Sequence, residues 1–230
     1  NMIGTIINTL AVVVGSCLGL RLKKGIPERC QKVFFQVIGL FTLSLGITMV
    51  VSMQHILVVI FALVLGSLFG IWCNIEKHIE LLGDTLKQRL KVKNEKFSEG
   101  LITAFLLFCV GSMTILGAIQ EGLGNSSDLL FTKSVLDGFS SIILASAFGV
   151  GVLFSALPLF LFQAVITLLA VQIAPFFTAE MINALTSVGG IMLIGLGFNI
   201  LEIKKIAVSN ILPSLLFVCL FMYLYQFINF

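Results

Sequence analysis

Long apolar stretches follow one another along most of this chain, separated by short polar connections. We identify eight such segments, at residues 3–20, 33–53, 55–74, 100–119, 137–157, 159–175, 182–201 and 206–228. A helix needs about 20 mostly apolar residues to cross a hydrocarbon core of about 30 Å. The pattern therefore predicts an all-α polytopic bundle of about eight transmembrane helices, with residues 1–230 as a single transmembrane domain.

The division between the fifth and sixth segments depends on Pro158. Proline removes a helix hydrogen bond and clashes with the preceding turn, so we place a turn at residues 156–158. The sixth segment is short and contains Gln163 and Gln172. It is interpreted either as a full span or as a re-entrant or interfacial segment.

Composition supports the membrane interpretation and excludes an ordinary soluble domain. Of the 230 residues, 58% are hydrophobic and 11% are charged, with a mean hydropathy of +1.12, whereas soluble domains carry about 25% charged residues. The five cysteines lack metal-ligand spacing, and the sequence has no G-x-S-x-G, Walker or H-E-x-x-H motif. We therefore expect no catalytic residues, no cofactor, no metal and no nucleic-acid partner.

Positive charge predicts the orientation in the membrane. Of the 14 Lys and Arg residues, 13 lie in three connections, at residues 21–32, 77–96 and 204–205, and Lys133 is the exception. Basic residues concentrate in cytoplasmic loops. All 13 lie on one side if 159–175 spans, which places both termini outside a bacterial inner (plasma) membrane.

The longest basic connection, residues 75–99, has an amphipathic pattern. Apolar residues recur at helical spacing, at positions Ile75, Ile79, Leu82, Leu86 and Leu90. We expect a helix lying on the inner leaflet with its lysines near anionic headgroups. A partner-binding role for this segment is the alternative to a simple connector.

Two patterns suggest internal repeats. Small residues four positions apart, with serine after the first, occur at residues 15–19, 66–70 and 145–149. Such strips let helices pack closely, within one chain or across a homodimer seam, and favour duplicated helix pairs. The second pattern relates Gly39 and Gly46 to Gly190 and Gly197. Because those two segments run in opposite predicted directions, this match favours an inverted repeat, as in secondary transporters.

Charged residues are expected to avoid the middle of every span. The predicted outer side carries Glu121, Asp128, Asp137 and Glu180 against Lys133. Glu121 ends the fourth segment and Asp137 opens the fifth, so the short loop between them predicts a carboxylate pair at an outer acidic mouth. Such a pair, with Glu180, would attract cations; helix capping also explains Asp137.

Neutral amides inside the segments are the candidates for a polar substrate path. Unpartnered amides are costly in lipid, so they are expected to face the bundle interior. The candidate residues, with one hydroxyl, are Asn8, Gln36, Gln163, Asn183, Thr186 and Asn199. They are interpreted either as path-lining residues or as hydrogen bonds between helices.

Several longer stretches resemble one known family. They include residues 4–8, 25–29, 110–123, 133–138, 151–156 and 195–199. Together they are similar to the DUF554 family, the YqgA and YdfK type of bacterial inner-membrane proteins, over nearly the whole chain. The resemblance implies a polytopic membrane protein, often presumed to be a transporter and usually drawn with six or seven spans, and it provides no established site residues.

The sequence thus favours a channel or secondary transporter for a small solute or cation. Its path would be lined by neutral amides, hydroxyls and backbone, with carboxylates at the outer mouth. The alternative is a non-transporting signalling or assembly component acting through residues 75–99. Expected partners are the lipid bilayer, a small solute or cation and a second copy in a homodimer.

Overall fold

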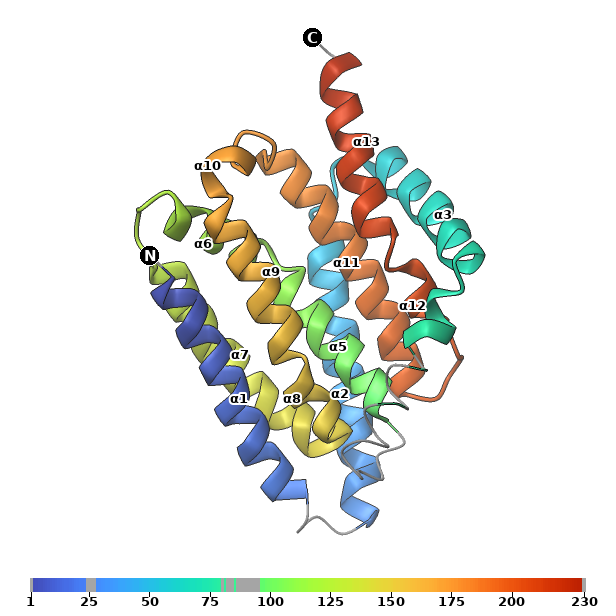
Figure 1. Cartoon of the computed structure of the whole chain (residues 1–230). Helices are drawn as coiled ribbons and strands as arrows, with labels where there is room; N and C mark the ends of the chain where they lie inside the picture. Colours follow the sequence, from blue (N-terminus) through green and yellow to red (C-terminus); the bar gives the residue numbers. More distant parts are fainter. Residues whose placement is uncertain (1, 24–27, 80, 82–84, 86–95, 229–230) are drawn as a thin grey trace. The chain divides into compact units, whose positions relative to one another are not determined.

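A computed structural model describes residues 2–23, 28–79, 81, 85 and 96–228. The helices, coloured along the chain in Figure 1, are α1 (Ile3–Lys23), α2 (Glu28–Val51), α3 (Ile56–Trp72), α5 (Phe97–Cys109), α6 (Ser112–Gly122), α7 (Asp128–Phe148), α8 (Val150–Phe154), α9 (Ala156–Leu168), α10 (Ala170–Ile173), α11 (Ala179–Ile200), α12 (Val208–Ile211) and α13 (Ser214–Ile228). The all-α prediction is confirmed for this part of the chain. Leu82, Leu86 and Leu90 of the predicted amphipathic stripe lie outside the described residues.

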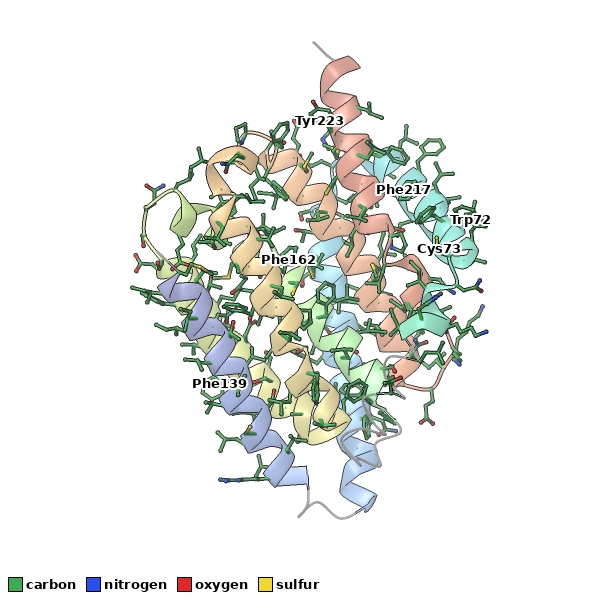
Figure 2. The ribbon with its side chains drawn as sticks, viewed as in Figure 1. Trp72, Cys73, Phe139, Phe162, Phe217 and Tyr223 are labelled. Carbon is green, nitrogen blue, oxygen red and sulfur yellow. The ribbon has the colours of Figure 1, made fainter. Side chains whose placement is uncertain are left out.

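The described helices have the length and hydropathy of membrane spans. Five qualify alone, at Ile3–Leu22, Asp128–Phe148, Val150–Leu168, Ala179–Ile200 and Val208–Tyr225. A bent pair, Phe97–Cys109 with Met113–Gly122, would make a sixth, and two apolar helices are shorter. Large apolar side chains such as Phe139 and Trp72 are exposed and extend outward (Figure 2), as lipid contact requires. The membrane fold is confirmed; the number eight is not.

Two predicted boundaries are corrected. The fourth segment is not one straight helix, because α5 and α6 meet at a 57° bend. The break between the fifth and sixth segments falls at Gly149, whose φ of 82° suits glycine, rather than at residues 156–158. Pro158 instead lies in the first turn of α9, where a missing N–H costs no helix hydrogen bond.

The chain divides into two compact units. The first unit comprises residues 1–38 and 87–175, and the second comprises residues 39–86 and 176–230. In the first unit, α1 and α7 run in the same direction and pack along their length (Figure 1). Gly15 and Gly19 make this approach possible, since a Cβ on Gly15 would collide with Gly138 O and Ser141 Oγ. The first predicted small-residue strip is thus a helix-packing surface within the chain.

In the second unit, the two glycine pairs noticed in the sequence pack on each other. A Cβ on Gly46 would lie 2.7 Å from Gly190 O, and one on Gly190 would lie 2.8 Å from Gly46 O. A Cβ on Gly197 would lie 3.2 Å from Gly39 O. The end of α2 and α11 are therefore antiparallel, and each glycine of the first pair meets the counterpart of the other: Gly46 lies against Gly190, and Gly39 lies against Gly197.

The same relation extends to the neighbouring helices. Gly39 and Gly46 precede Gly190 and Gly197 by 151 residues. When the sequence is aligned with itself at this offset, α1 aligns with α9 and α10, α2 with α11, and α3 with α12 and the first part of α13. Within the first unit α1 packs antiparallel to α9 (Figure 1). Within the second, α3 packs antiparallel to α12 and α13, with Gly66 against Ser214 and Gly70 against Asn210. These antiparallel counterparts are the arrangement that an inverted repeat produces.

Candidate functional site

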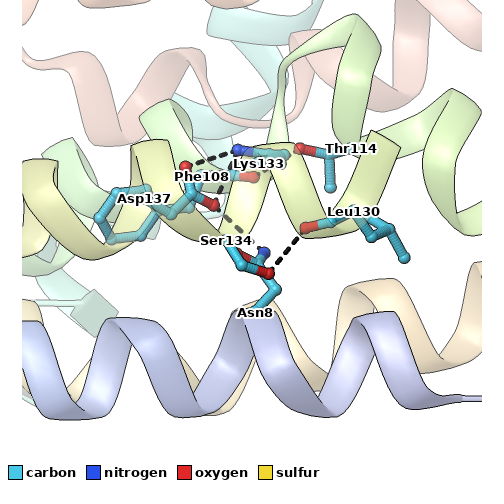
Figure 3. Close-up of polar contacts among 7 residues, drawn as sticks. All are labelled: Asn8, Phe108, Thr114, Leu130, Lys133, Ser134 and Asp137. Atoms are coloured by element: carbon cyan, nitrogen blue, oxygen red, sulfur yellow. Dashed lines mark hydrogen bonds and ion pairs between the residues drawn. The ribbon is translucent and has the colours of Figure 1, made fainter. Parts of the chain in front are cut away.

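A buried ion pair lies inside the first unit. Lys133 and Asp137 stand one turn apart on α7, and their residues are 5% and 4% exposed. Lys133 Nζ donates to Asp137 Oδ1 at 2.7 Å and to Oδ2 at 2.8 Å. From α1, Asn8 Nδ2 donates to Oδ2 at 3.2 Å (Figure 3). The carboxylate therefore accepts three hydrogen bonds from two residues.

This pair lies well inside a candidate span. Asp137 is the tenth residue of α7, which begins at Asp128, so it lies about 14 Å from the helix start at 1.5 Å per residue. The prediction that no charge lies deep within a span is therefore wrong. The sequence pattern placed Asp137 at a helix end because charges raise the polarity of residues 128–137. In the structure each of the two charges neutralises the other on one buried face, while Val135 and Phe139 keep the opposite face apolar.

The break between α5 and α6 lies beside the pair (Figure 3). Thr114 Oγ1 donates to Phe108 O at 2.7 Å across the bend and so satisfies a carbonyl that the interrupted helix leaves free. Cys109, the last residue of α5, is close enough to interact electrostatically with both Lys133 and Asp137. An interrupted helix and a buried charge pair thus share one region of the first unit.

Glu121 caps a helix instead of pairing with Asp137. Its side chain is 1% exposed and accepts four hydrogen bonds: from Gly4 N at 2.6 Å, Thr5 N at 3.1 Å, Thr5 Oγ1 at 3.0 Å and Ser127 Oγ at 2.9 Å. The first N–H groups of a helix are free and carry positive partial charge, so the carboxylate caps α1. Glu121 and Asp137 do not form the predicted carboxylate pair, because each is bonded to other groups.

Two amides in the first unit have polar atoms without a partner among the described residues. They are Asn8 Oδ1 and both amide atoms of Gln163, and both side chains are fully buried. Thr5 Oγ1 lies 3.3 Å from Thr167 Oγ1, which aligns antiparallel α1 and α9. Asn8 follows Thr5 by three residues and Gln163 precedes Thr167 by four. Both therefore lie about 5–6 Å further along the bundle, at the same depth.

Two more buried polar groups without a partner, both hydroxyls, lie further along the first unit in the direction in which α1 runs. Ser16 Oγ and Thr103 Oγ1 also have no hydrogen-bond partner in the described part of the chain. Ser16 lies eight residues, about 12 Å, beyond Asn8 on α1. Phe97 of α5 packs against Phe154 of α8, with ring centroids 5.8 Å apart, so the two helices are at the same depth there. Thr103 lies six residues further along α5, at a depth between those of Asn8 and Ser16. Buried polar atoms are normally satisfied, so this series needs an explanation.

The other predicted path residues are positioned differently. Gln36 is exposed on the same face of α2 as Val33 and Leu40, so the expectation that it faces the interior is wrong. In the second unit, two asparagines bond loop backbone. Asn183 Nδ2 donates to Ser52 O at 2.8 Å and its Oδ1 accepts from Gln54 N at 3.2 Å; Asn199 bonds Ile206 N and O at 2.6 and 2.8 Å. These two amides hold loops to helices.

The remaining predicted site residues are Thr186 and Glu180, whereas Lys133 belongs to the site without having been predicted. Thr186, in α11, is half-buried, and its Oγ1 has no partner among the residues described. Glu180 is exposed and lies 3.6 Å from His55 Nε2. Sequence reasoning missed Lys133, although its i, i+4 spacing from Asp137 was a usable signal. Within the described residues no group of three His, Cys, Asp or Glu side chains could hold a metal ion.

Known proteins resemble this chain along nearly its whole length. The family described as "Protein of unknown function (DUF554)" matches residues 3–223. "Uncharacterized membrane protein YdfK" of Bacillus subtilis (strain 168) is 38% identical over 221 residues, which cover 94% of this chain and 93% of that protein. "Uncharacterized protein YqgA" of Escherichia coli (strain K12) is 33% identical over 220 residues, 94% of both chains. No solved structure matches the chain.

Proposed function

This chain belongs to the DUF554 family, and we propose that it is a secondary transporter or channel that moves a small solute or ion across the membrane. The observation that carries the proposal is the buried Lys133–Asp137 pair with Asn8. The functional centre is thus ionisable, unlike the path of neutral amides that the sequence favoured.

The energetics of the pair argue for a function beyond stability. Removing two charges from water costs several kcal/mol per ion, and a pair of similar-sized apolar residues often serves a fold as well or better. Ionisable residues inside spans are rare and usually mark ion or substrate pathways. Lys133 and Asp137 are both almost completely buried in α7. Their presence is explained by transport more directly than by packing.

The surrounding architecture fits the same proposal. Secondary transporters are commonly built from inverted repeats, with the substrate site formed at an interrupted helix. Here α1–α3 have antiparallel counterparts in α9–α13, and the α5–α6 interruption adjoins the ion pair. The unpartnered polar atoms of Asn8, Gln163, Thr103 and Ser16 extend from this site to greater depth along the first unit. They provide hydrogen-bonding groups for water or a polar solute along a path.

Flux through purified protein tests the proposal. The full chain is reconstituted in liposomes, and uptake of sodium, potassium, methylammonium, lactate and alanine is measured against protein-free vesicles. The informative variant is the double substitution Lys133→Met with Asp137→Asn, which removes both charges together and leaves no unpaired ion. Asp128→Asn, an exposed acid in the first turn of α7, is the matched control.

We expect protein-dependent flux of at least one of these solutes, lost in the double variant and kept in Asp128→Asn. Absence of flux for the whole set would contradict the proposal. So would flux that persists unchanged in a folded double variant. In either case the non-transporting alternative would be favoured, in which the basic segment 75–99 recruits a partner.

A further inference from the structure

The hydrogen-bond donors around Asp137 form a receptor for a carboxylate. Lys133 Nζ contacts both carboxylate oxygens and Asn8 Nδ2 contacts one of them, and all three residues are almost completely buried. Ammonium and amide donors converging on two oxygens match any carboxylate, whether it belongs to the protein or to a ligand. In the described state, the protein's own carboxylate occupies this receptor.

We propose that this site binds a small monocarboxylate together with a proton, the proton on Asp137 and the substrate carboxylate on Lys133. The inference rests on the proposed transport function and names its substrate class. Once protonated, Asp137 no longer pairs with the Lys133 ammonium. The substrate carboxylate then takes the place of Asp137 as the partner of Lys133. The exchange substitutes one carboxylate for another as the partner of Lys133, and the only bond formed is the O–H of Asp137, whose proton enters with the substrate and leaves with it.

Charge balance favours this combination over a single bound ion. The Lys133–Asp137 pair is neutral, and an uncompensated charge in a low-dielectric site is costly. A bound monovalent cation alone would leave the site with a charge of +1, and a bound monovalent anion alone would leave it at −1. A proton with a carboxylate keeps the site neutral throughout. The same reasoning disfavours a channel for a single ion at this position.

The unpartnered oxygen of Asn8 is an independent sign of the proton. In the described state Asn8 Nδ2 donates to Asp137, whereas Asn8 Oδ1 has no partner among the described residues. A protonated carboxyl group and a carboxamide complement each other through two hydrogen bonds. The amide N–H donates to the acid C=O, and the acid O–H donates to the amide oxygen. Protonation of Asp137 therefore supplies the donor that Asn8 Oδ1 lacks.

Gln163 provides further hydrogen bonds for the substrate. Both of its amide atoms are buried without a described partner, and it lies at the depth of Asn8 on the neighbouring α9. Its N–H and oxygen are available to a polar group that the substrate carries beyond its carboxylate, such as a hydroxyl. A short hydroxy acid combines both groups. Lactate is therefore a suitable probe.

Few other titratable groups face Asp137 from the helices around it. Cys109 approaches from α5, and Lys133 shares α7. Glu121, near the end of α6, is bonded to four donors and is occupied in capping α1. The described parts of α1 and α8 that pack on α7 contribute no ionisable side chain at this depth. The proton is therefore assigned to Asp137.

The test is lactate uptake driven by a pH gradient. Liposomes containing the full chain receive radiolabelled lactate outside, uptake is followed over seconds, and uptake by protein-free liposomes is subtracted. An outside pH one unit below the inside pH should drive about tenfold accumulation through one-to-one proton coupling. Clamping the membrane potential with potassium and valinomycin should leave the rate unchanged, because the proposed cargo is neutral overall.

Single substitutions distinguish binding of the proton from binding of the substrate carboxylate. In Asp137→Asn the pH-gradient effect should disappear, while exchange of labelled for unlabelled lactate continues, because Lys133 still binds the anion. Lys133→Met should lose both activities, and Lys133→Arg should retain a measurable, slower form of both, because the larger guanidinium keeps the charge but fits the buried site less well. Lys133→Arg keeps the charge and tests the assignment if Lys133→Met fails to fold. Asp128→Asn serves again as the control acid.

Lactate uptake that follows the membrane potential, or ignores the pH gradient, would overturn the inference. So would uptake of alanine or cations by a chain that does not take up lactate, although the transport proposal would then stand. Absence of flux for every solute in the set would overturn both. The two failures are therefore distinguishable.

Discussion

Replacing Lys133 with methionine leaves the Asp137 carboxylate buried beside Asn8 without its cation. The protein can avoid burying an unpaired charge by protonating the carboxyl group. The free energy of this protonation is therefore the upper limit of the loss in folding stability. For an ordinary aspartate with a pKa of about 3.9, protonation at pH 7 costs about 4 kcal/mol, at about 1.4 kcal/mol per pH unit. At pH 5 the limit falls to about 1.5 kcal/mol. The Lys133→Met variant should therefore be least stable at high pH.

Replacing Asp137 with asparagine gives the opposite slope. The buried Lys133 ammonium then lacks its anion, and the fold can avoid the charge by deprotonating it. From an ordinary lysine pKa of about 10.4, this costs about 4.6 kcal/mol at pH 7 and about 1.9 kcal/mol at pH 9. This variant should be least stable at low pH. The double variant, which contains neither charge, should differ little from the parent chain and show no added pH slope.

Unfolding in mixed micelles, titrated with dodecyl sulfate and followed by helical circular dichroism, measures these differences. The three variants and the parent chain are compared at pH 5, 7 and 9. The reasoning would be refuted if both single variants matched the parent chain, or if their slopes had the same sign. Either result would mean that the pair is hydrated rather than buried.

Three further predictions follow from local geometry. Gly15→Ala should destabilise the chain by about 1–3 kcal/mol through overpacking, whereas Gly138→Ala, with its nearest atom at 3.5 Å, should cause no loss; equal midpoints in the same unfolding assay would contradict this. Glu121→Gln replaces one accepting oxygen with a donor and should cost about 2–3 kcal/mol, detected as faster amide hydrogen exchange in the first turn of α1; unchanged exchange would count against the cap. In a background without native cysteines, Thr103→Cys should react with a water-soluble thiol reagent, while Leu159→Cys, a buried apolar position, should not; equal labelling would argue against a polar path at Thr103.

The apolar pattern was sufficient to predict the class of fold and the opposite directions of two of its helices. Lengths and hydropathy predicted membrane helices, and the predicted topology gave the segments of Gly39 and Gly46 and of Gly190 and Gly197 opposite directions, as α2 and α11 have; their contact was not predicted. These features are local or periodic, so they are visible in a single sequence. The boundary at Gly149 was missed because a proline nearby was a stronger local signal than a glycine.

The site was not predictable in the same way. Lys133 and Asp137 lower the hydropathy of their segment when counted separately, although together they form a neutral pair that a span can bury. The contact between Glu121 and Gly4 joins residues 117 positions apart, so no local pattern indicates it. Amides were ambiguous for a related reason. Asn8 faces the ion pair and Asn199 bonds a loop, and both give the same signal in an apolar sequence.

The most direct test of the account is solute uptake by liposomes that contain the Lys133→Met, Asp137→Asn double variant. The account predicts a folded protein, with an unfolding midpoint close to that of the parent chain, that has lost the parent's flux. A folded double variant that transports at the parent's rate would contradict it, because the buried pair would then be a structural feature alone.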